Sequence, residues 1–361
     1  MLFNSIFIFF YFLDIIYHPI MISVTALQEK NLQLEKQHFH DQIDDLIDKN
    51  INERNCNEIL HVILVVSNPV NYHRRYELFE KCIDRFGQHP QIKLYTTELQ
   101  QGNKPYQTSA KYKYRTNHEI WHKENLINLT VQKLDKNWTK MAWIDADIAF
   151  INPNWVRDTL DALEHYKVVQ LFQNAIDLGP NLEVLNVFTG IGYAHCMNLN
   201  ISYLQYCGHD GITNKFYHPG YGYAINRKAF NKIGGLIDYA ILGSADSHMA
   251  YSFLEKVNET LNSKLHINYK KKIKIFEDRC KQYIKKNFGY VPGTILHYFH
   301  GKKQDRKYGD RWKILINHQY DPLRDIFYDA QGLLQLTQNK PEFRDEIRRY
   351  FRGRNEDSID I

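Results

Sequence analysis

The sequence lacks the cysteine patterns that hold small secreted domains or zinc modules together. Its 361 residues include only five cysteines, which are widely spaced and contain no C-x-x-C pair. A disulfide framework and a zinc knuckle both need paired, closely patterned cysteines, so neither is indicated. We therefore expect reduced, structural thiols. The five residues are Cys56, Cys82, Cys196, Cys207 and Cys280.

An excess of charge of one sign is also missing. Lysine and arginine number 46 and the acidic residues 41, which leaves a net charge of +5. That balance is too mild to indicate nucleic-acid binding, and no tract interleaves basic, aromatic and glycine residues as known modules do. We expect the basic cluster Lys270–Lys274 on a solvated face. A second cluster, Lys302–Arg311, follows two histidines.

The chain lacks internal repeats and low-complexity tracts, and its one long hydrophobic run is at the N-terminus. Residues 1–24 are nearly long enough to cross a bilayer, which takes about 20 apolar residues. Asp14 and Pro19 interrupt the run and no basic residue precedes it, so it is a candidate signal-anchor with poor support as a secretory signal. Residues 25–56 follow as an amphipathic helix, a stem or short coiled coil that would allow a homodimer. A cytoplasmic and a membrane-associated location both stay open.

Strands and helices alternate from residue 57, which indicates an α/β domain with a mostly parallel sheet over residues 57–320. The run Ile59–Pro69 is rich in β-branched residues without alternation, as is typical of a strand buried on both faces. Residues 321–361 are expected to form a charged helical tail. The other expected elements are helices at 71–86, 117–135 and 155–165, strands at 92–97, 141–151 and 167–172, and a loop at 98–116.

Two aspartates interrupt one of these strands. The segment "KMAWIDADIAFINP" (Lys140–Pro153) is apolar except for Asp145 and Asp147. Alternate residues of a strand share a face, so the two carboxylates are expected about 7 Å apart at Cα, where they repel by roughly 2 kcal/mol. A strand end that faces a crevice, together with a hard divalent cation shared with phosphates, would relieve this repulsion. The alternative is that Asp145 caps a turn and Asp147 pairs with an arginine.

The stretch "WIDADIAF" resembles the D-x-D signature of GT-A glycosyltransferases, and the resemblance covers most of residues 59–311. It implies a GT-A, Rossmann-like fold, with a mostly parallel central sheet flanked by helices. It also implies a nucleotide-sugar donor and a Mn²⁺ or Mg²⁺ cofactor. Asp147 would then bind the metal, and Asp145 would hold the donor ribose or a metal-bound water. The wide use of Asn, Lys, Ile and Tyr is typical of an AT-rich coding sequence, such as that of a large DNA virus.

Two stretches resemble donor-binding segments of that family. In "VVSNPVNYHRR" the residues that match the nucleotide-binding loop after the first strand are Ser67, Asn68, Arg74 and Arg75. The arginines have surface charge as their alternative. In "WHKENL" the resemblance implies donor contacts from Lys123 and Asn125, and charge on a helix surface is the equal alternative.

The stretch "GYAINRKAFNKIGGLIDYAILGSADSHMA" is similar to the acceptor side of inverting glycosyltransferases. Asp246 matches the catalytic residue, which takes the proton of the acceptor hydroxyl as its oxygen attacks. The usual Glu-Asp pair is replaced by "SADS", so one acid is present. Asp238 is a weaker alternate, and the structural alternative is that Asp246 caps a helix starting at Ser247. Gly234 and Gly235 would allow close backbone approach to the donor sugar.

The stretch "HYFHGKKQDRKYGDR" supplies late histidines and basic residues. The resemblance implies that His300, or His297 in its place, completes the metal site opposite the aspartates. The basic residues would neutralise the departing nucleoside diphosphate. They are Lys302, Arg306 and Arg311.

Aromatic residues in "HPGYGY" have two interpretations: Tyr221 and Tyr223 either stack on sugar rings or belong to the core. The combined motifs predict a metal-dependent glycosyltransferase, with inversion favoured, that moves a sugar from a nucleotide-diphosphate donor. UDP is favoured, and the acceptor would be a hydroxyl on a glycan, protein or lipid. The alternatives are a catalytically inactive binding module of the same fold and a nucleotidyltransferase. The latter is disfavoured because "SNPVNYHRR" lacks a glycine-rich, lysine-bearing phosphate loop.

Overall fold

The computed structural model describes residues 58–203 and 217–359. The hydrophobic segment at 1–24 and the amphipathic helix at 25–56 lie outside these ranges, as do Cys56 and Cys207. Within them, no helix combines the length and apolar character that a bilayer crossing requires. Cys82, Cys196 and Cys280 carry free thiols, as the spacing of the cysteines predicts.

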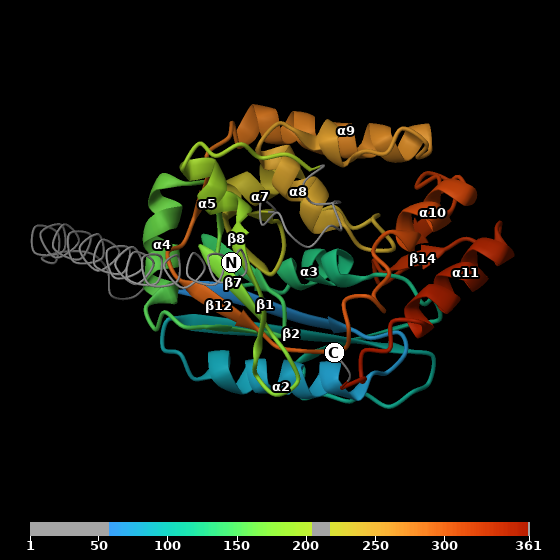
Figure 1. Cartoon of the computed structure of the whole chain (residues 1–361), viewed down its shortest axis with the longest axis horizontal. Coiled ribbons are helices and arrows are strands. Elements are labelled where there is room, and N and C mark those ends of the chain that lie inside the picture. Colours follow the sequence, from blue (N-terminus) through green and yellow to red (C-terminus); the bar gives the residue numbers. More distant parts are fainter. Residues whose placement is uncertain (1–57, 204–216, 360–361) are drawn as a thin grey trace, which may run out of the picture. The chain divides into compact units, whose positions relative to one another are not determined.

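A seven-stranded sheet forms the centre of the domain, in the order β11-β6-β10-β4-β1-β2-β3 (Figure 1). Strand β10 runs antiparallel to its neighbours β4 and β6, and the other pairs are parallel. The expected α/β class with a mostly parallel sheet is therefore confirmed. The strands are β1 (Leu60–Ser67), β2 (Ile92–Gln101), β3 (Tyr112–Thr116), β4 (Lys140–Ile144), β6 (Val168–Gln170), β10 (Gly222–Asn226) and β11 (Phe288–Tyr290).

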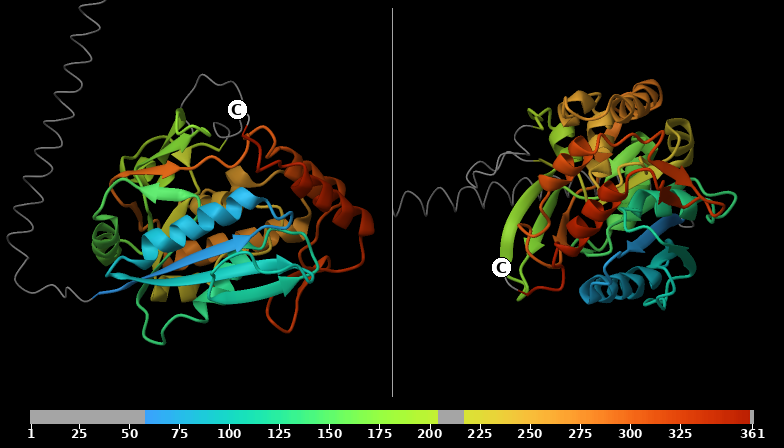
Figure 2. Two further views of the ribbon diagram at one scale, coloured as in Figure 1. Left: turned by 90° about the horizontal axis from the view of Figure 1, so that it is seen from below. Right: turned by 90° about the vertical axis from the view of Figure 1, so that its right-hand side faces the viewer.

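Helices cover both faces of this sheet (Figures 1 and 2). Alternate residues of β1 point to opposite sides, so Val62 and Leu64 join one buried cluster and Ile63 joins the other. The first cluster includes apolar residues of α2 (His73–Gly87) and α4 (Trp155–His165). The second includes residues of α3 (Lys123–Val131), α7 (Arg227–Ile233), α8 (Ala245–Phe253) and α9 (Ile267–Tyr283).

A five-stranded sheet in the order β5-β12-β7-β8-β9 stands beside the central one. Residues 141–151 were expected to form one strand. Instead, the chain leaves the central sheet at Ile144 and enters the second sheet as β5, which pairs with β12. One continuous strand is therefore wrong. Carboxylates inside a doubly covered strand would lose their hydration, whereas a turn between the sheets keeps them at an edge. The strands are β5 (Ile148–Phe150), β7 (Asn174–Leu178), β8 (Val184–Gly190), β9 (Tyr217–His218) and β12 (Thr294–His297).

Two boundaries also differ from expectation. The segment 98–116, expected as a loop, contains the end of β2 and the edge strand β3, which pair in parallel. Polar residues fit there because Glu98 accepts hydrogen bonds from Gln107 N, Thr108 N and Thr108 Oγ1 at 2.7–3.0 Å. The helix expected at 117–135 is limited to α3, and α5 (Ile191–Cys196) follows β8.

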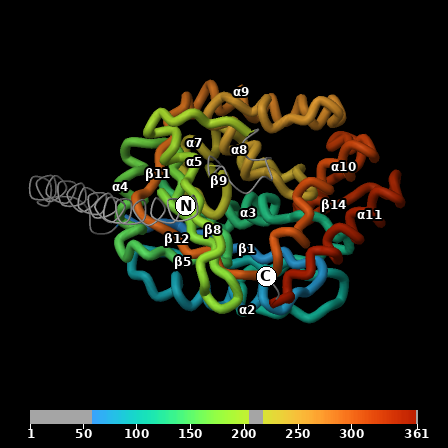
Figure 3. The backbone as a smooth tube through the Cα atoms, in the orientation of Figure 1, coloured from blue at the N-terminus to red at the C-terminus, as the bar shows by residue number. Residues whose placement is uncertain are grey.

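The segment 321–361 is only partly helical, which corrects the expectation of a helical tail. After α10 (Asp310–Asn317) come a hairpin of β13 (Ile326–Tyr328) and β14 (Leu334–Leu336), then α11 (Pro341–Arg352). Apolar residues of α11 at spacings of three and four, including Phe343 and Ile347, enter the same core as α8 and α9. The chain end runs beside α2 (Figure 3), so this segment is part of the domain.

We expect the fold to lose stability in mild acid through its buried histidines. His248 lies 2.7 Å from Thr260 Oγ1 and 3.1 Å from Tyr269 OH, and burial lowers its pKa to about 3. The unfolded chain takes up this proton near pH 6.5 and the folded chain does not, so stability falls as the pH drops below 6.5. By pH 5 the loss from this residue is about 2 kcal/mol.

Urea unfolding at pH 7.5 and pH 5.0 measures this loss. His248→Gln keeps an amide that donates and accepts hydrogen bonds but does not titrate, so its stability should change less between the two pH values than the wild type's. His122 and His218, whose pKa values are also lowered by burial, still titrate in the variant. An unchanged pH dependence in His248→Gln would contradict the assignment.

Candidate metal centre

The turn Asp145–Asp147 lies at the carboxyl end of β4 and is held by backbone contacts from three directions. Asp145 N donates to Tyr221 O at 2.7 Å, and Tyr298 N donates to Asp147 O at 2.8 Å. From α2, Cys82 Sγ lies 3.1 Å from Ala146 O. The turn is therefore fixed between the two sheets, and its two carboxylates meet different partners.

Asp147 meets two histidines, His297 at the end of β12 and His300 in the following loop. Its Oδ2 lies 3.0 Å from His300 Nε2 and 3.8 Å from His297 Nε2. One ligand atom from each of the three residues lies within 4.8 Å of the others, and both histidines are buried. Asp147 Oδ1 is buried without a hydrogen-bond partner. One carboxylate and two imidazoles are acceptable ligands for Mn²⁺, so these residues fit a divalent cation.

His297 is oriented by Asp177 on β7, a residue that the sequence analysis missed. Asp177 Oδ1 lies 2.8 Å from His297 Nδ1 and accepts a hydrogen bond from Tyr221 OH at 2.8 Å, and Lys303 pairs with the same carboxylate. Burial disfavours the charge of His297, but Asp147 and Asp177 outweigh it and raise its pKa to about 9. One feature of the sequence could have indicated Asp177, because it is the single acid in the strand "NAIDL".

His300 is enclosed by Arg306 and by Glu356, a second residue that the sequence analysis missed. Arg306 Nη2 donates to His300 Nε2 at 3.1 Å, and Glu356 Oε2 lies 3.6 Å from His300 Nδ1. Burial and the Arg306 charge lower the pKa of His300. Although burial opposes ionisation of Asp147, His297 and His300 hold the pKa of that carboxyl well below its usual range.

Asp145 does not belong to the cluster of Asp147, His297 and His300. The expectation that both aspartates share one metal site is therefore corrected. It forms an ion pair with Lys123 at the start of α3. Burial raises the pKa of Asp145, Lys123 opposes this, and Asp147 and Asp246 add to it. Lys123 is therefore brought to the site, where it neutralises Asp145.

Asp246 lies in the first turn of α8. The helix begins at Ala245, so the alternative in which Asp246 caps a helix starting at Ser247 is wrong. Its Oδ1 accepts from Ser247 N at 2.8 Å, and its Oδ2 lies 3.0 Å from where a Cβ on Gly220 would stand. Glycine at 220 thus leaves room for this carboxylate beside the chain that leads into β10.

Glu124 brings a further carboxyl to this side of the domain, although the sequence near Asp246 has only one acid. It is buried in α3, and its Oε2 accepts from Trp121 Nε1 at 3.0 Å. Burial raises the pKa of Glu124 to about 7, Lys123 lowers it, and Asp246 raises it further. Glu124 belongs to the stretch "WHKENL", from which only Lys123 and Asn125 were proposed, and its neighbourhood with Asp246 has no local signal because α3 is far from residue 246 in sequence.

Most of the residues near the end of β1 that were expected to contact the donor instead contact other residues of the protein. Asn68 donates to Tyr72 O at 2.7 Å and accepts from Tyr72 N at 3.0 Å, which closes the loop. Arg75 pairs with Glu356, and Arg74 Nη1 lies 3.4 Å from Phe299 O. Asn68 and Arg75 therefore have structural partners in the places where donor contacts were expected.

Ser67, which was also expected to contact the donor, differs from these residues. Ser67 Oγ at the end of β1 is buried without a hydrogen-bond partner. A buried hydroxyl without a partner is uncommon, so Ser67 is the residue of the β1 loop best suited to meet a ligand.

Asn125 and Asp238 hold the C-terminal hairpin, which differs from the roles expected for them. Asn125 Nδ2 donates to Gly332 O at 3.1 Å, and its Oδ1 accepts from Leu334 N at 3.0 Å. Asp238 accepts from Tyr328 OH at 2.7 Å. Both side chains are used by the hairpin, so neither the donor contact nor the alternate base is supported by its position.

The double glycine ends a helix. Gly234 caps α7 with φ of 84°, and Gly235 follows with φ of 85°. A Cβ on Gly235 would lie 3.0 Å from Asn128 Oδ1, so the close neighbour is a side chain of α3. Glycine adopts this left-handed backbone geometry without strain. The end of the helix is therefore a sufficient reason for the two glycines, and close approach to a donor sugar is not needed to explain them.

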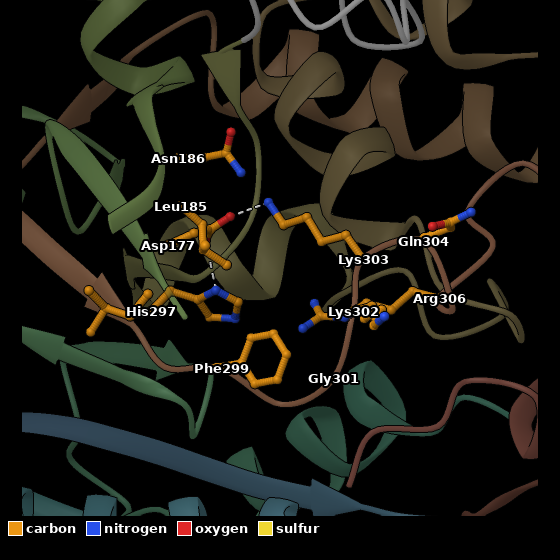
Figure 4. Close-up of a pocket in the computed structure, with 11 residues that line it drawn as sticks. Asp177, Leu185, Asn186, His297, Phe299, Gly301, Lys302, Lys303, Gln304 and Arg306 are labelled. Atoms are coloured by element: carbon orange, nitrogen blue, oxygen red, sulfur yellow. Dashed lines mark hydrogen bonds and ion pairs between the residues drawn. The ribbon is translucent and has the colours of Figure 1, made fainter. Parts of the chain in front are cut away.

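The basic residues after His300 surround a pocket of about 180 Å³ (Figure 4). Lys302 and Arg306 line it together with His297, and Lys303 rather than Lys302 reaches Asp177. Arg311 does not line this pocket. It lies in α10 with its guanidinium 4.9 Å from the ring of Tyr308. The other lining residues are Asp177, Leu178, Leu185, Asn186, Phe299, Gly301, Lys303 and Gln304.

The two tyrosines divide between the alternatives stated for them. Tyr223 is core, buried against Trp143 with its OH donating to Pro219 O at 2.6 Å. Tyr221 is also buried, but it supports the metal centre. Its ring stacks on His218 at 3.9 Å between centroids, and its OH donates to Asp177.

No protein-family model matches the sequence, and no curated protein matches it. Among solved structures, it is similar to a mutant Drosophila β-1,4-galactosyltransferase 7 in complex with manganese, UDP-Gal and xylobiose, at 11% identity and TM-score 0.36, with 79% of this chain and 98% of that chain covered. It is similar to a nucleotide-diphospho-sugar transferase of Desulfovibrio desulfuricans at 9% identity and TM-score 0.30, covering 66% and 82%.

A third similar structure is the galactosyltransferase LgtC in complex with donor and acceptor sugar analogues. The sequence identity is 9% and the TM-score is 0.28, and the match covers 79% of this chain and 100% of that chain. These neighbours are nucleotide-sugar transferases. Their scores are low, so function is argued from the residues of this chain.

The structural role of Asn125 is testable. Asn125→Ala leaves Gly332 O and Leu334 N without their buried partners, and we expect a loss of about 1–3 kcal/mol in unfolding free energy. Urea denaturation measures it, with Lys133→Ala at an exposed position of the same segment as a control that stays near the wild type. Wild-type stability in Asn125→Ala would show that the hairpin contacts contribute nothing.

Proposed function

We propose that the chain is a metal-dependent glycosyltransferase. It would move a sugar from a nucleotide-diphosphate sugar, with UDP favoured, to a hydroxyl on a glycan, protein or lipid. The observation that carries this proposal is the convergence of Asp147, His297 and His300 at the carboxyl edge of the parallel strands. Ligands in open α/β sheets bind at that edge.

Asp147, His297 and His300 would hold Mn²⁺ or Mg²⁺. When bound, the cation would neutralise the donor diphosphate and the charge that develops on the departing nucleoside diphosphate. Lys302 and Arg306 line the neighbouring pocket and would add positive charge for the same phosphates. Asp145 would be held by Lys123 near the ribose, as the resemblance to the family implies.

Asp246 would act as the base of an inverting reaction. The acceptor oxygen attacks the sugar carbon, its proton passes to the Asp246 carboxylate, and the bond from that carbon to the diphosphate breaks. Gly220 leaves space at this carboxylate, and the electrostatic influence of Asp246 on Asp145 and Glu124 supports a common site.

A catalytically inactive module of the same fold is less well supported. His297 and His300 are buried, and the Asp147 Oδ1 atom is buried without a hydrogen-bond partner. Buried polar groups of this kind cost stability unless a ligand meets them, so a pure structural role would be expected to replace them. A nucleotidyltransferase has no specific observation in its favour.

Melting temperature tests the donor site. With UDP and Mn²⁺ at 100 times their dissociation constant, we expect stabilisation of about 2.7 kcal/mol, a rise of about 4 °C for a domain of this size. UDP or Mn²⁺ alone should give less, and GDP and CMP should give less in the presence of Mn²⁺. Asp147→Ala should lose the rise because it removes the carboxylate ligand.

Asp161→Ala is the matched control for this experiment, because Asp161 is exposed on α4. It should keep the full rise. A protein that melts cooperatively yet shows no shift with any nucleotide, with or without metal, would overturn the proposed donor site. A shift of equal size in Asp147→Ala would overturn the assignment of its metal ligand.

Turnover tests the base. Asp246→Asn keeps the shape of the side chain but cannot take a proton, so transfer from the active UDP-sugar should fall by about 10²–10⁴-fold. The measurement is UDP release with a panel of UDP-sugars and hydroxyl acceptors. Asp161→Asn should turn over like the wild type, and the melting shift with UDP and Mn²⁺ should be unchanged in Asp246→Asn. Wild-type turnover in that variant would exclude Asp246 as the base.

A further inference from the structure

The ring of His300 raises a question about proton placement. A metal-binding imidazole must present one nitrogen without a proton, and the other nitrogen then carries the proton and donates it to an acceptor. At His297 the acceptor is Asp177, 2.8 Å from Nδ1, which leaves Nε2 toward Asp147. His300 also turns its Nε2 toward Asp147, so the question is which group receives the proton on its Nδ1.

Arg306 determines which nitrogen of His300 carries the proton. Asp147 Oδ2, 3.0 Å from His300 Nε2, would accept a proton there, but the hydrogen bond from Arg306 Nη2 at 3.1 Å requires a lone pair on that nitrogen, because a guanidinium has only donors. In the neutral ring the proton is then on Nδ1. Among the described residues, that buried nitrogen has no hydrogen-bond partner, and the carboxylate of Glu356 lies 3.6 Å away.

Glu356 is held in this position by two arginines. It is 1% exposed, and its carboxylate pairs with Arg75 from α2 and with Arg354 two residues earlier. The two arginines compensate the charge of this buried carboxylate, so it can remain a hydrogen-bond acceptor. At 3.6 Å the carboxylate lies just beyond hydrogen-bond distance of Nδ1, so a shift of a few tenths of an ångström would make it the acceptor of the Nδ1 proton.

The segment that carries Glu356 is fixed at several points. Asp357 accepts from His73 N and Arg74 N at 2.9 Å at the start of α2. Asn355 N donates to Tyr72 OH at 3.0 Å. A Cβ on Gly301 would lie 2.7 Å from Asn355 O, so the segment passes directly over the residue that follows His300. The C-terminal segment is therefore built against the metal-binding loop.

We propose that Glu356 is a positioning residue of the metal centre: it accepts the Nδ1 proton of His300 and so presents Nε2 to the cation. It does for His300 what Asp177 does for His297, and the proposal rests on the proposed function. The C-terminal segment thereby completes a site whose other residues come from the turn after β4 and from the β12 loop. On metal binding the cation takes the place of the Arg306 contact at Nε2.

Mn²⁺ binding tests this proposal, followed by the loss of the free Mn²⁺ signal in electron paramagnetic resonance. Mutation of such an outer partner costs about 10–100-fold in metal affinity, so Glu356→Gln, whose neutral amide oxygen is a weaker acceptor than the carboxylate, should bind Mn²⁺ that much more weakly than the wild type. Asp357→Ala is the matched control: it loosens the same segment at α2 but does not touch His300, and its Mn²⁺ affinity should equal the wild type's.

Three outcomes of the titration are decisive. Wild-type affinity in Glu356→Gln would overturn the role of Glu356 while leaving the metal site intact. Equal weakening in both variants would also overturn it, because the cause would be the anchoring of the segment. Absence of Mn²⁺ binding in the wild type would overturn the proposed function itself, and the proposal with it.

A second measurement locates the proton of His300 in the wild-type protein itself. Two-bond ¹H–¹⁵N correlations of histidine rings distinguish the two neutral forms, and His300→Gln assigns the signal. In the metal-free wild-type protein we expect the proton of His300 on Nδ1. A proton on Nε2 would overturn the proposal, as would the same Nδ1 form in a folded Glu356→Gln protein that binds Mn²⁺ normally.

Discussion

The separation of two neighbouring carboxylates is the constraint on which the site depends. Asp145 and Asp147 are two residues apart at the edge of a buried sheet, where a pair of like charges is costly. The chain relieves the repulsion by turning from the central sheet into the second one between them. Asp145 then pairs with Lys123, and Asp147 faces His297 and His300. The same turn therefore separates a carboxylate neutralised by lysine from one that faces two imidazoles.

The support of these groups comes from segments that are distant in sequence. Asp177 on β7 fixes His297 and is itself held by Tyr221 and Lys303. Glu356 occupies the matching place at His300. A buried carboxylate is tolerated only when donors surround it, so Asp177 and Glu356 are each paired with basic side chains. The C-terminal segment and the second sheet thus hold the geometry of β12 and the following loop, which carry His297 and His300.

Polar residues that match a motif are often used by the backbone. Asn68 closes the loop after β1, and Asn125 holds the hairpin of β13 and β14. Short amides commonly satisfy nearby main-chain groups, which must be paired when buried. The double glycine is explained in the same way, because Gly234 ends α7 in the left-handed region. Their residue types fit a donor site, but their contacts belong to the fold.

The sequence by itself determined the alternation of strands and helices and the mostly parallel sheet, because local hydrophobic patterns carry that information. It also named Asp147, His297 and His300 as candidate metal ligands, and the structure brings these three together. Only the tertiary structure decided that Asp145 pairs with Lys123 outside the cluster. It also decided that Asp177 and Glu356 stand behind the histidines. The local sequence does not show what either acid contacts, since each acquires its role from a partner more than 50 residues away. Which charges share a buried space depends on how the sheets and the chain end pack together.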